Sequence, residues 1–365
     1  MPGRSADLRY AKQNVSSLTV YPSATACAGA SGASNERRHG PRLSVSPGLL
    51  RIDPWGTELR DKRGASKDNG CSKGTAGRNS SRCASQYMID LHTHTNESDG
   101  TLSPQQLIEA SQRIGLQALA ITDHDTLAGY DLAVPHAPRA GIELVCGVEL
   151  SINCSGRSIH LLVYFLRNPP THDFRQWLLS LQAGRRKRNE ALVRKLCSQG
   201  MPITLEEVAA HGGRLLARPH FAAVMIEKGY AASRREAFDK YLDEAGSCYV
   251  SRQEPHFGEA MDRIRAAQGI AVLPHPSRIG LSWEQLQPMV VDMCDLGLKG
   301  IEVYHSDHSP AETDFYLHLA RKFGMAATGG SDFHGETKPG IALGTGKGSN
   351  LKLPYSILEE LRQIL

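Results

Sequence analysis

The chain has 365 residues, of which 40% are hydrophobic and 22% are charged, a composition typical of a globular protein with one large α/β domain or about two domains. Its net charge of +4 is uneven, because residues 1–87 hold 14 Lys and Arg against 6 Asp and Glu, while the remaining residues hold 28 against 32. No apolar run approaches the ~18 residues of a membrane span, so the sequence excludes a membrane-spanning chain. The eight cysteines lack the spacing of a disulfide scaffold. The charge distribution excludes a globally basic nucleic-acid binder. We therefore expect a cytoplasmic protein with no membrane association and no obligate protein partner.

Residues 1–87 differ in composition from the rest of the chain. They are rich in Ser, Gly, Ala and Arg and show no sustained helical or strand periodicity, so they cannot bury enough apolar surface to offset chain entropy. We interpret them as a disordered extension, with a dispersed basic arm that contacts nucleic acid as the alternative. Because Met88 directly precedes the first apolar run, a chain that starts at Met88 is expected to fold and to remain active.

The residues that follow alternate between helix and strand signals. Ser103 is a favourable helix N-cap, Pro104 suits the first helical position, and Gly115 is a favourable helix stop. The further elements predicted up to residue 164 are a strand over 118–121, a helical stretch interrupted by Pro135 and Pro138, a strand near 143–148, and a hairpin from Ser151 to Tyr164 that turns at residues 154–157.

Residues 173–255 break this alternation, because their periodicity is mostly helical. We interpret them as a helical insertion that covers the site, within a domain that spans residues 88–350. The alternation then resumes with a helix over 258–268, a strand over 270–273, a helix over 282–296, a strand over 300–304, a helix over 310–323 and a strand over 325–328. Repeated βα units predict an α/β fold with a parallel sheet or barrel, whose chemistry lies at the carboxyl ends of the strands.

Possible metal ligands follow several of the predicted strands. His92 and His94 come after the apolar run that begins at Met88, and side chains two residues apart on a strand point the same way. The other candidates are His124 after 118–121, Glu149 after 144–148, His275 after 270–273, and Asp332 and His334 after 325–328. A lone pair of histidines is equally compatible with ordinary polar residues. So many ligand types at strand ends, however, predict one shared metal site.

Five ordered motifs resemble those of the PHP family, the polymerase and histidinol phosphatase type phosphoesterases. The motifs are His92-Thr93-His94 with Ser98-Asp99-Gly100, Ile121-Thr122-Asp123-His124, Gly147-Val148-Glu149, Pro274-His275-Pro276 and Gly330-Ser331-Asp332-Phe333-His334-Gly335. The resemblance runs from about Met88 to Gly346. Within the family, Ala217-Arg218-Pro219-His220-Phe221 resembles the ribonuclease AM-like subgroup, which hydrolyses nucleoside 3′,5′-bisphosphates and trims RNA from its 5′ end.

The resemblance implies a distorted (β/α)7 barrel that holds three divalent metal ions, with Mn²⁺ favoured and Fe²⁺ or Zn²⁺ as alternatives. The ligand sets that it implies are His92, His94, Glu149 and Asp332 for one ion, Glu149, His160 and His275 for a second, and Asp99, His124 and His334 for a third. It also makes Glu149, Asp332 and His334 the catalytic residues. The family often has His where Asp99 stands, and a carboxylate still supplies a hard ligand.

The residue types agree with this chemistry. Six imidazoles and three carboxylates suit borderline to hard divalent ions, and the absence of Cys from these motifs argues against a structural zinc site. Paired ions lower the pKa of a shared water and neutralise phosphate oxygens, so no Ser or Cys nucleophile is needed. Asp123 and Asp125 are interpreted as residues that orient the ligands. His305 and His308 are interpreted as polar residues at the rim, with protonation of the leaving oxygen as the alternative.

A second phosphate contact is expected from the helical insertion. An Arg guanidinium can bind phosphate through two hydrogen bonds. Arg218 of the insertion, with His220 beside it, could therefore bind a phosphate group of the substrate. The alternative is that Arg218 pairs with Glu206 or Glu207. The run of residues 185–188 could contact an RNA backbone, or it could be a solvated helix surface, since four consecutive residues surround a helix.

Three functions are compatible with the sequence. The preferred one is a metal-dependent phosphoesterase that removes the 3′-phosphate of nucleoside 3′,5′-bisphosphates or digests short RNA in the 5′-3′ direction. The second is a small-molecule phosphatase of the histidinol phosphate type, which needs a pocket for an amine and no second phosphate contact. The third is a non-catalytic metal-binding module, and the complete ligand set weighs against it.

Overall fold

The computed structural model describes residues 88–212 and 214–364 of the chain. The extension predicted over residues 1–87 lies outside the described residues. Within the described part, no helix is both long and apolar enough to cross a membrane. The cysteines of this part are all free thiols, which confirms for these residues that no disulfide framework is present.

Seven strands of the described chain form one sheet, in which spatial order follows chain order from β1 to β7. They are β1 (Met88–Asp90), β2 (Leu116–Ile121), β3 (Glu143–Cys154), β4 (Arg157–Phe165), β5 (Ile270–Leu273), β6 (Gly300–His305) and β7 (Ala326–Gly330). Neighbouring strands are parallel except at β4, which is antiparallel to both β3 and β5. A second, two-stranded sheet pairs β8 (Ile341–Ala342) with β9 (Gly346–Lys347). The main sheet is therefore mixed and not wholly parallel.

The antiparallel strand β4 arises from a local turn signal. β3 ends at Cys154 and β4 begins at Arg157, so Ser155 and Gly156 alone form the turn. Both residues have positive φ, 51° and 81°, as a two-residue type I′ hairpin turn requires. The predicted hairpin is confirmed, and it places His160, one of the predicted metal ligands, on β4.

Backbone hydrogen bonds beyond the ends of β1 and β7 close the sheet into a barrel. The amide of Asp332 donates to the carbonyl of His92 at 2.8 Å, and the amide of His94 donates to the carbonyl of Phe333 at 2.9 Å. The buried carboxylate of Asp90 reinforces this seam by accepting from the amide and the hydroxyl of Ser331, at 2.8 and 2.5 Å. The predicted distorted (β/α)7 barrel is confirmed, and its first and last ligand motifs lie side by side.

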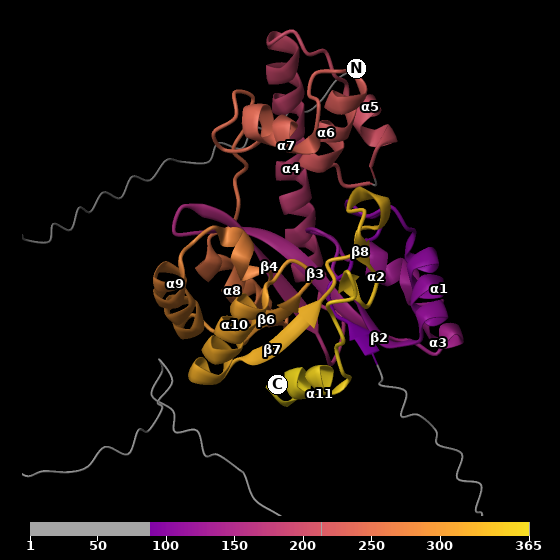
Figure 1. Cartoon of the computed structure of the whole chain (residues 1–365), viewed down its shortest axis with the longest axis vertical. Helices are drawn as coiled ribbons and strands as arrows, with labels where there is room; N and C mark the ends of the chain where they lie inside the picture. Colours follow the sequence, from indigo (N-terminus) through magenta and orange to yellow (C-terminus); the bar gives the residue numbers. More distant parts are fainter. Residues whose placement is uncertain (1–87, 213, 365) are drawn as a thin grey trace, which may run out of the picture. The chain divides into compact units, whose positions relative to one another are not determined.

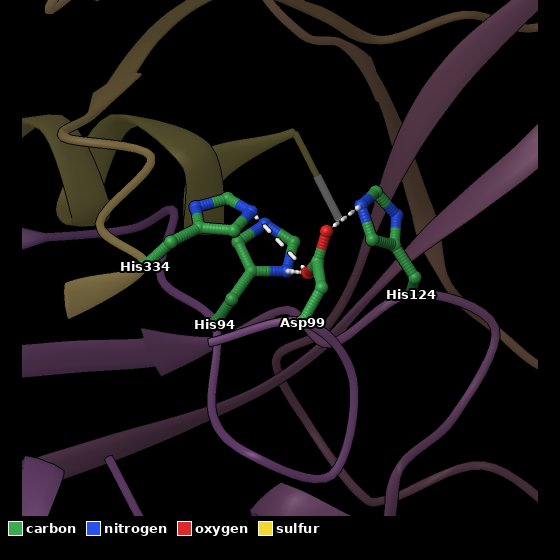
Figure 2. A group of neighbouring side chains, drawn as sticks. All are labelled: His94, Asp99, His124 and His334. Atoms are coloured by element: carbon green, nitrogen blue, oxygen red, sulfur yellow. Dashed lines mark ion pairs between the residues drawn. The ribbon is translucent and has the colours of Figure 1, made fainter. Parts of the chain in front are cut away.

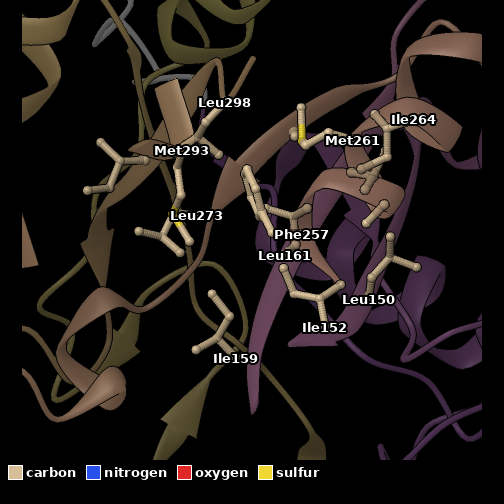
Figure 3. Packing of buried hydrophobic residues seen from close by; sticks show 14 of the residues in the cluster. Leu150, Ile152, Ile159, Leu161, Phe257, Met261, Ile264, Leu273, Met293 and Leu298 are labelled. Atoms are coloured by element: carbon tan, nitrogen blue, oxygen red, sulfur yellow. The ribbon is translucent and has the colours of Figure 1, made fainter. Parts of the chain in front are cut away.

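Helices cover the outside of the barrel and complete its apolar core (Figure 1). They are α1 (Pro104–Ile114), α2 (Ala128–Ala133), α3 (Ala137–Ala140), α8 (Phe257–Ala266), α9 (Trp283–Asp295), α10 (Pro310–Phe323) and α11 (Ser356–Gln363), with short 3₁₀ turns at Pro276–Ile279 and Gly335–Thr337. The predicted cap of α1 is confirmed, because the Ser103 side chain accepts from the amide of Gln106. Figure 3 shows part of the core, where Phe257 and Ile264 of α8 pack in one cluster with Leu161 of β4.

Residues 172–242 are mostly helical, as predicted. The segments are α4 (His172–Ser198), α5 (Leu205–Ala210), α6 (Arg218–Glu227), α7 (Arg234–Ala237) and one π-helical turn, η1 (Phe238–Leu242). Leu192, Phe221 and Met225 belong to an apolar cluster of these helices that is separate from the barrel core. Figure 1 shows α4 running from the sheet toward α5, α6 and α7. This arrangement supports our proposal that residues 173–255 are an insertion in a barrel domain spanning residues 88–350.

Gly330 offers a test of the barrel seam. A Cβ atom at this position would lie 2.5 Å from the backbone nitrogen of His92, and that backbone cannot move without separating β1 from β7. Gly330→Ala should therefore lower the free energy of unfolding by about 1–3 kcal/mol, measured by urea denaturation. The control is Gly258→Ala in α8, where nothing lies within 4 Å of the added Cβ and helix propensity improves. Equal stability of the two variants would contradict this account of the seam.

Candidate active site

All nine metal-ligand candidates lie together at one end of the barrel, where Glu149 and His160 belong to β3 and β4 and the other seven lie outside the strands. Within the described residues, their side chains form four overlapping groups in which the ligand atoms lie within 4.8 Å of one another. The groups are His94, Asp99, His124 and His334; His92, Glu149 and His275; His92, His94 and Asp332; and His124, Glu149 and His160. Residues from both ends of the barrel sequence thus contribute to one site.

Asp99 lies at the centre of the first group, with three imidazole rings around its carboxylate (Figure 2). Its Oδ1 is 3.6 Å from Nδ1 of His94 and 3.3 Å from Nε2 of His334. Its Oδ2 is 3.6 Å from Nε2 of His124. Burial alone would raise the pKa of Asp99, but His334 and His124 hold it well below its usual range. The structure therefore brings the third predicted set together and adds His94 to it.

Glu149 connects the remaining groups. Its Oε1 is 2.9 Å from Nδ1 of His160 and 2.8 Å from Nε2 of His275. Its Oε2 is 3.2 Å from Nε2 of His94 and 3.2 Å from Nδ1 of His124. Burial alone would raise the pKa of Glu149, but the surrounding imidazoles, His160 first among them, hold it well below its usual range. A carboxylate that presents its two oxygens to different imidazoles has the geometry of a bridging ligand.

The cluster contains buried polar atoms that suit divalent cations. Nε2 of His92, Nε2 of His94, Nδ1 of His124 and Oδ1 of Asp99 are buried and have no hydrogen-bond partner in the part of the chain that the structure describes, although such atoms are normally paired. Burial lowers the pKa of His94, but the neighbouring carboxylates of Asp332 and Glu149 raise it to about 9. These carboxylates therefore favour positive charge in the cluster. Because imidazole nitrogens and carboxylate oxygens are ligands of borderline to hard ions, the residues fit a metal centre.

Buried carboxylates outside the cluster hold its ligands in place. Nδ1 of His92 is 3.0 Å from Oε1 of Glu302, and Oε2 of Glu302 accepts from the amide of His275 at 2.8 Å. Burial alone would raise the pKa of Glu302, but His92 and His305 lower it to about 2. A carboxylate that binds one ring nitrogen leaves the other directed at the metal position, so Glu302 sets the orientation of His92.

Asp123 and Asp125 have different tasks. Asp123 accepts from the amide of Thr95 at 2.7 Å and from the hydroxyl of Ser98 at 2.5 Å, which fixes the loop between the ligands His94 and Asp99. This agrees with the orienting role predicted for Asp123. Asp125 instead forms ion pairs with Arg185 and Arg252, at 2.6 and 2.8 Å, and so connects the cluster to the helical segment.

A cavity of about 250 Å³ lies over the cluster. Apart from ligand candidates, its charged lining consists of Arg185, Arg188, Arg218, Arg252, Glu254, Arg278 and Lys338. Arg278 and Lys338 each contact Oδ2 of Asp332 at 2.6 Å. The cavity therefore combines possible metal ligands with a high density of cationic side chains, a combination that suits phosphate.

The structure corrects the interpretation of residues 185–188 as a solvated helix surface. Arg185 and Arg188 are buried, whereas Arg186 and Lys187 are exposed. The run is therefore not a solvated surface over its whole length, and its contact with an RNA backbone stays a prediction. Two of its four residues, three positions apart on α4, face the cavity.

Arg218 and His220 lie in different surroundings. Among the described residues Arg218 forms no ion pair; its guanidinium lies over the ring of Tyr249, 5.2 Å from the centroid, while Glu207 pairs with Lys228. His220 is buried and does not line the cavity. Its Nδ1 accepts from the amide of Ala217 at 3.1 Å, so His220 caps the start of α6. His220 thus has a positioning role next to Arg218, and its contact with phosphate stays a prediction.

Comparison with known proteins decides the family. The PHP domain model matches residues 90–248, and the chain is 36% identical to the 5′-3′ exoribonuclease Rnm of Salmonella typhimurium over 70% of this chain and 88% of that protein. The chain belongs to the PHP family. This PHP chain is also 30% identical to the 3′,5′-nucleoside bisphosphate phosphatase of Chromobacterium violaceum, over 70% of this chain and 90% of that protein. A solved structure from Bifidobacterium adolescentis, named as a metal-dependent phosphoesterase, matches with a TM-score of 0.66 and 30% identity over 76% of this chain and 96% of that one.

The PHP chain is thus a metal-dependent phosphoesterase, as the sequence predicted. Sequence reasoning missed Glu302, although a single carboxylate within the apolar run at residues 300–305 was a usable signal. It also misplaced His305 and His308. Both are buried and neither lines the cavity, so they are not rim residues. His305 lies behind the cluster, with Nε2 3.6 Å from Oδ2 of Asp332.

Proposed function

We propose that this PHP phosphoesterase removes the 3′-phosphate of nucleoside 3′,5′-bisphosphates and shortens 5′-phosphorylated RNA from its 5′ end. The observation that carries this proposal is that a cluster of metal-ligand candidates and a group of arginines line one cavity. A substrate with one phosphate at the cluster and a second at the arginines would satisfy both. The names of the relatives from Salmonella and Chromobacterium support the same two substrate classes.

The nine ligand candidates would hold three divalent ions, with Mn²⁺ preferred over Fe²⁺ and Zn²⁺. When bound, such ions activate water for attack and neutralise phosphate oxygens. His92, His94, His124 and Glu149 each belong to two of the observed groups, so we assign them to the border between neighbouring ion positions. Glu149, Asp332 and His334 would then be the residues closest to the reaction.

Side chains of the cavity complete the proposed catalytic arrangement. Arg278 and Lys338 hold Oδ2 of Asp332, which leaves Oδ1 near His92 and His94, at 3.5 and 3.4 Å. Because both cations also line the cavity, their other N–H groups can donate to phosphate oxygens as charge develops. The chain thereby places fixed positive charge beside the reacting phosphate.

The same cavity argues against a phosphatase of the histidinol phosphate type. A substrate with an ammonium group needs an unpaired acid, and the only lining acid outside the ligand candidates in residues 88–212 and 214–364 is Glu254. Arg252 already pairs with Glu254 at 3.3 Å. The complete set of nine ligand candidates likewise weighs against a non-catalytic module.

The substrate preference provides the test. Wild-type protein should show a higher kcat/KM for adenosine 3′,5′-bisphosphate than for adenosine 3′-phosphate, and Arg218→Ala should reduce that ratio about 10- to 100-fold, since a charge-assisted contact is lost. Initial rates of phosphate release on both substrates and on histidinol phosphate measure the effect. Arg235→Ala, a highly exposed arginine in α7, is the control. Equal rates of the wild type on both adenosine substrates would contradict the proposal.

A further inference from the structure

Five arginines line the cavity, and Arg278 is held at the metal-ligand cluster by Asp332. The other four differ in what holds them. Arg185 and Arg252 both pair with the buried Asp125 carboxylate. Arg218 rests on the Tyr249 ring. Three of the four guanidiniums therefore have a partner within the protein.

Arg188 is the exception. In residues 88–212 and 214–364 it forms no hydrogen bond and no ion pair, and its Nε is buried without a partner. The whole residue is only 6% exposed, and what remains accessible of it faces the cavity. Burial, together with the like charges of Arg185 and Arg218, lowers the pKa of Arg188 to about 8. A buried guanidinium without an acceptor is costly to maintain, which suggests that its acceptor is a ligand.

The charges around Arg188 indicate what kind of ligand fits. The four guanidiniums carry four positive charges, and the two acids among them, Asp125 and Glu254, carry two negative charges. The excess of about two positive charges matches a terminal phosphate monoester, whose charge near neutral pH is about −1.5 to −2. A phosphodiester, with a single negative charge, or a hydroxyl would leave part of this excess uncompensated.

We propose that Arg188 is a further specificity-determining residue, which receives the second, non-reacting phosphate monoester of the substrate together with Arg218. This inference rests on the proposed function and extends it to a residue that the sequence indicated only as part of the run at residues 185–188. Arg185 and Arg252 act as positioning residues, because Asp125 holds one guanidinium nitrogen of each in place. Arg188 therefore distinguishes a terminal phosphate from a phosphodiester or an unphosphorylated end.

Stability provides a test that does not depend on activity. Arg188→Met keeps the apolar stem and removes the unpaired charge, so in buffer without phosphate the metal-loaded variant should melt roughly 2–5 °C above wild type. Addition of adenosine 5′-phosphate should raise the melting temperature of wild type more than that of Arg188→Met, whereas adenosine should not distinguish them. Arg186→Met, a neighbouring exposed arginine on α4, should behave as wild type in both measurements.

Kinetics provide the second test. The ratio of kcat/KM for adenosine 3′,5′-bisphosphate to that for adenosine 3′-phosphate should fall about 10- to 100-fold in Arg188→Met and stay at the wild-type value in Arg186→Met. A lower melting temperature of Arg188→Met together with an unchanged ratio would show a structural role and overturn the inference. If wild type hydrolyses neither substrate, the proposed function fails. The role of Arg188 is then overturned separately if adenosine 5′-phosphate raises the melting temperatures of wild type and Arg188→Met equally.

Discussion

Glu149→Gln should lower kcat/KM for phosphate release by at least ~10³-fold while the protein stays folded. Glu149 lies against His94, His124, His160 and His275 at 2.8–3.2 Å, so its negative charge serves several ligand groups at once. The amide of Gln preserves the volume of the side chain but removes the charge. An amide also cannot present two equivalent anionic oxygens to two ions.

The measurement is the initial rate of phosphate release, with circular dichroism and thermal melting as checks of folding. Glu259→Gln is the matched control, because it makes the same chemical change on an exposed residue of α8 and should leave the rate unchanged. Wild-type activity in Glu149→Gln would remove Glu149 from the proposed metal centre.

Removal of metal should abolish activity to a similar or greater extent. After dialysis against a chelator, the protein should lose phosphate release, and Mn²⁺, Fe²⁺ or Zn²⁺ should restore it to different degrees. The melting temperature should fall on removal and rise on re-addition, because ions that bind the folded chain stabilise it by mass action. Metal analysis should find fewer ions in Glu149→Gln than in wild type. An active protein without divalent metal would refute the assignment of the cluster.

Local signals account for the parts of the structure that the sequence predicted well. Ser103 and Gly115 mark the start and the end of α1, because capping depends on a few neighbouring residues. The turn at Ser155-Gly156 specifies the hairpin for the same reason. Seven of the ligand candidates were found because they stand at or near the end of an apolar run, and the strands bring such ends to one face of the barrel. Asp99 and His160 were found only through the family resemblance.

Long-range partners account for the parts that the sequence did not predict. Arg185 is buried because Asp125, 60 positions earlier, accepts its hydrogen bond, and no periodicity in residues 185–188 indicates that partner. Glu302 bonds His92, 210 positions earlier, so its role depends on the closed barrel. Hydrophobic patterns locate elements, but they do not identify which buried charges neutralise one another.

The barrel seam also determines when the site can form during synthesis. Asp90 and Ser331, which bond across the seam, are 241 positions apart, so at ~5–20 residues per second the second partner is made roughly 10–50 s after the first. Until then, the nascent chain contains His92 and His94 but lacks Asp332 and His334. The ligand set is therefore completed only when translation of the described chain is nearly finished. The phosphoesterase site is therefore incomplete for most of the time that the chain spends on the ribosome.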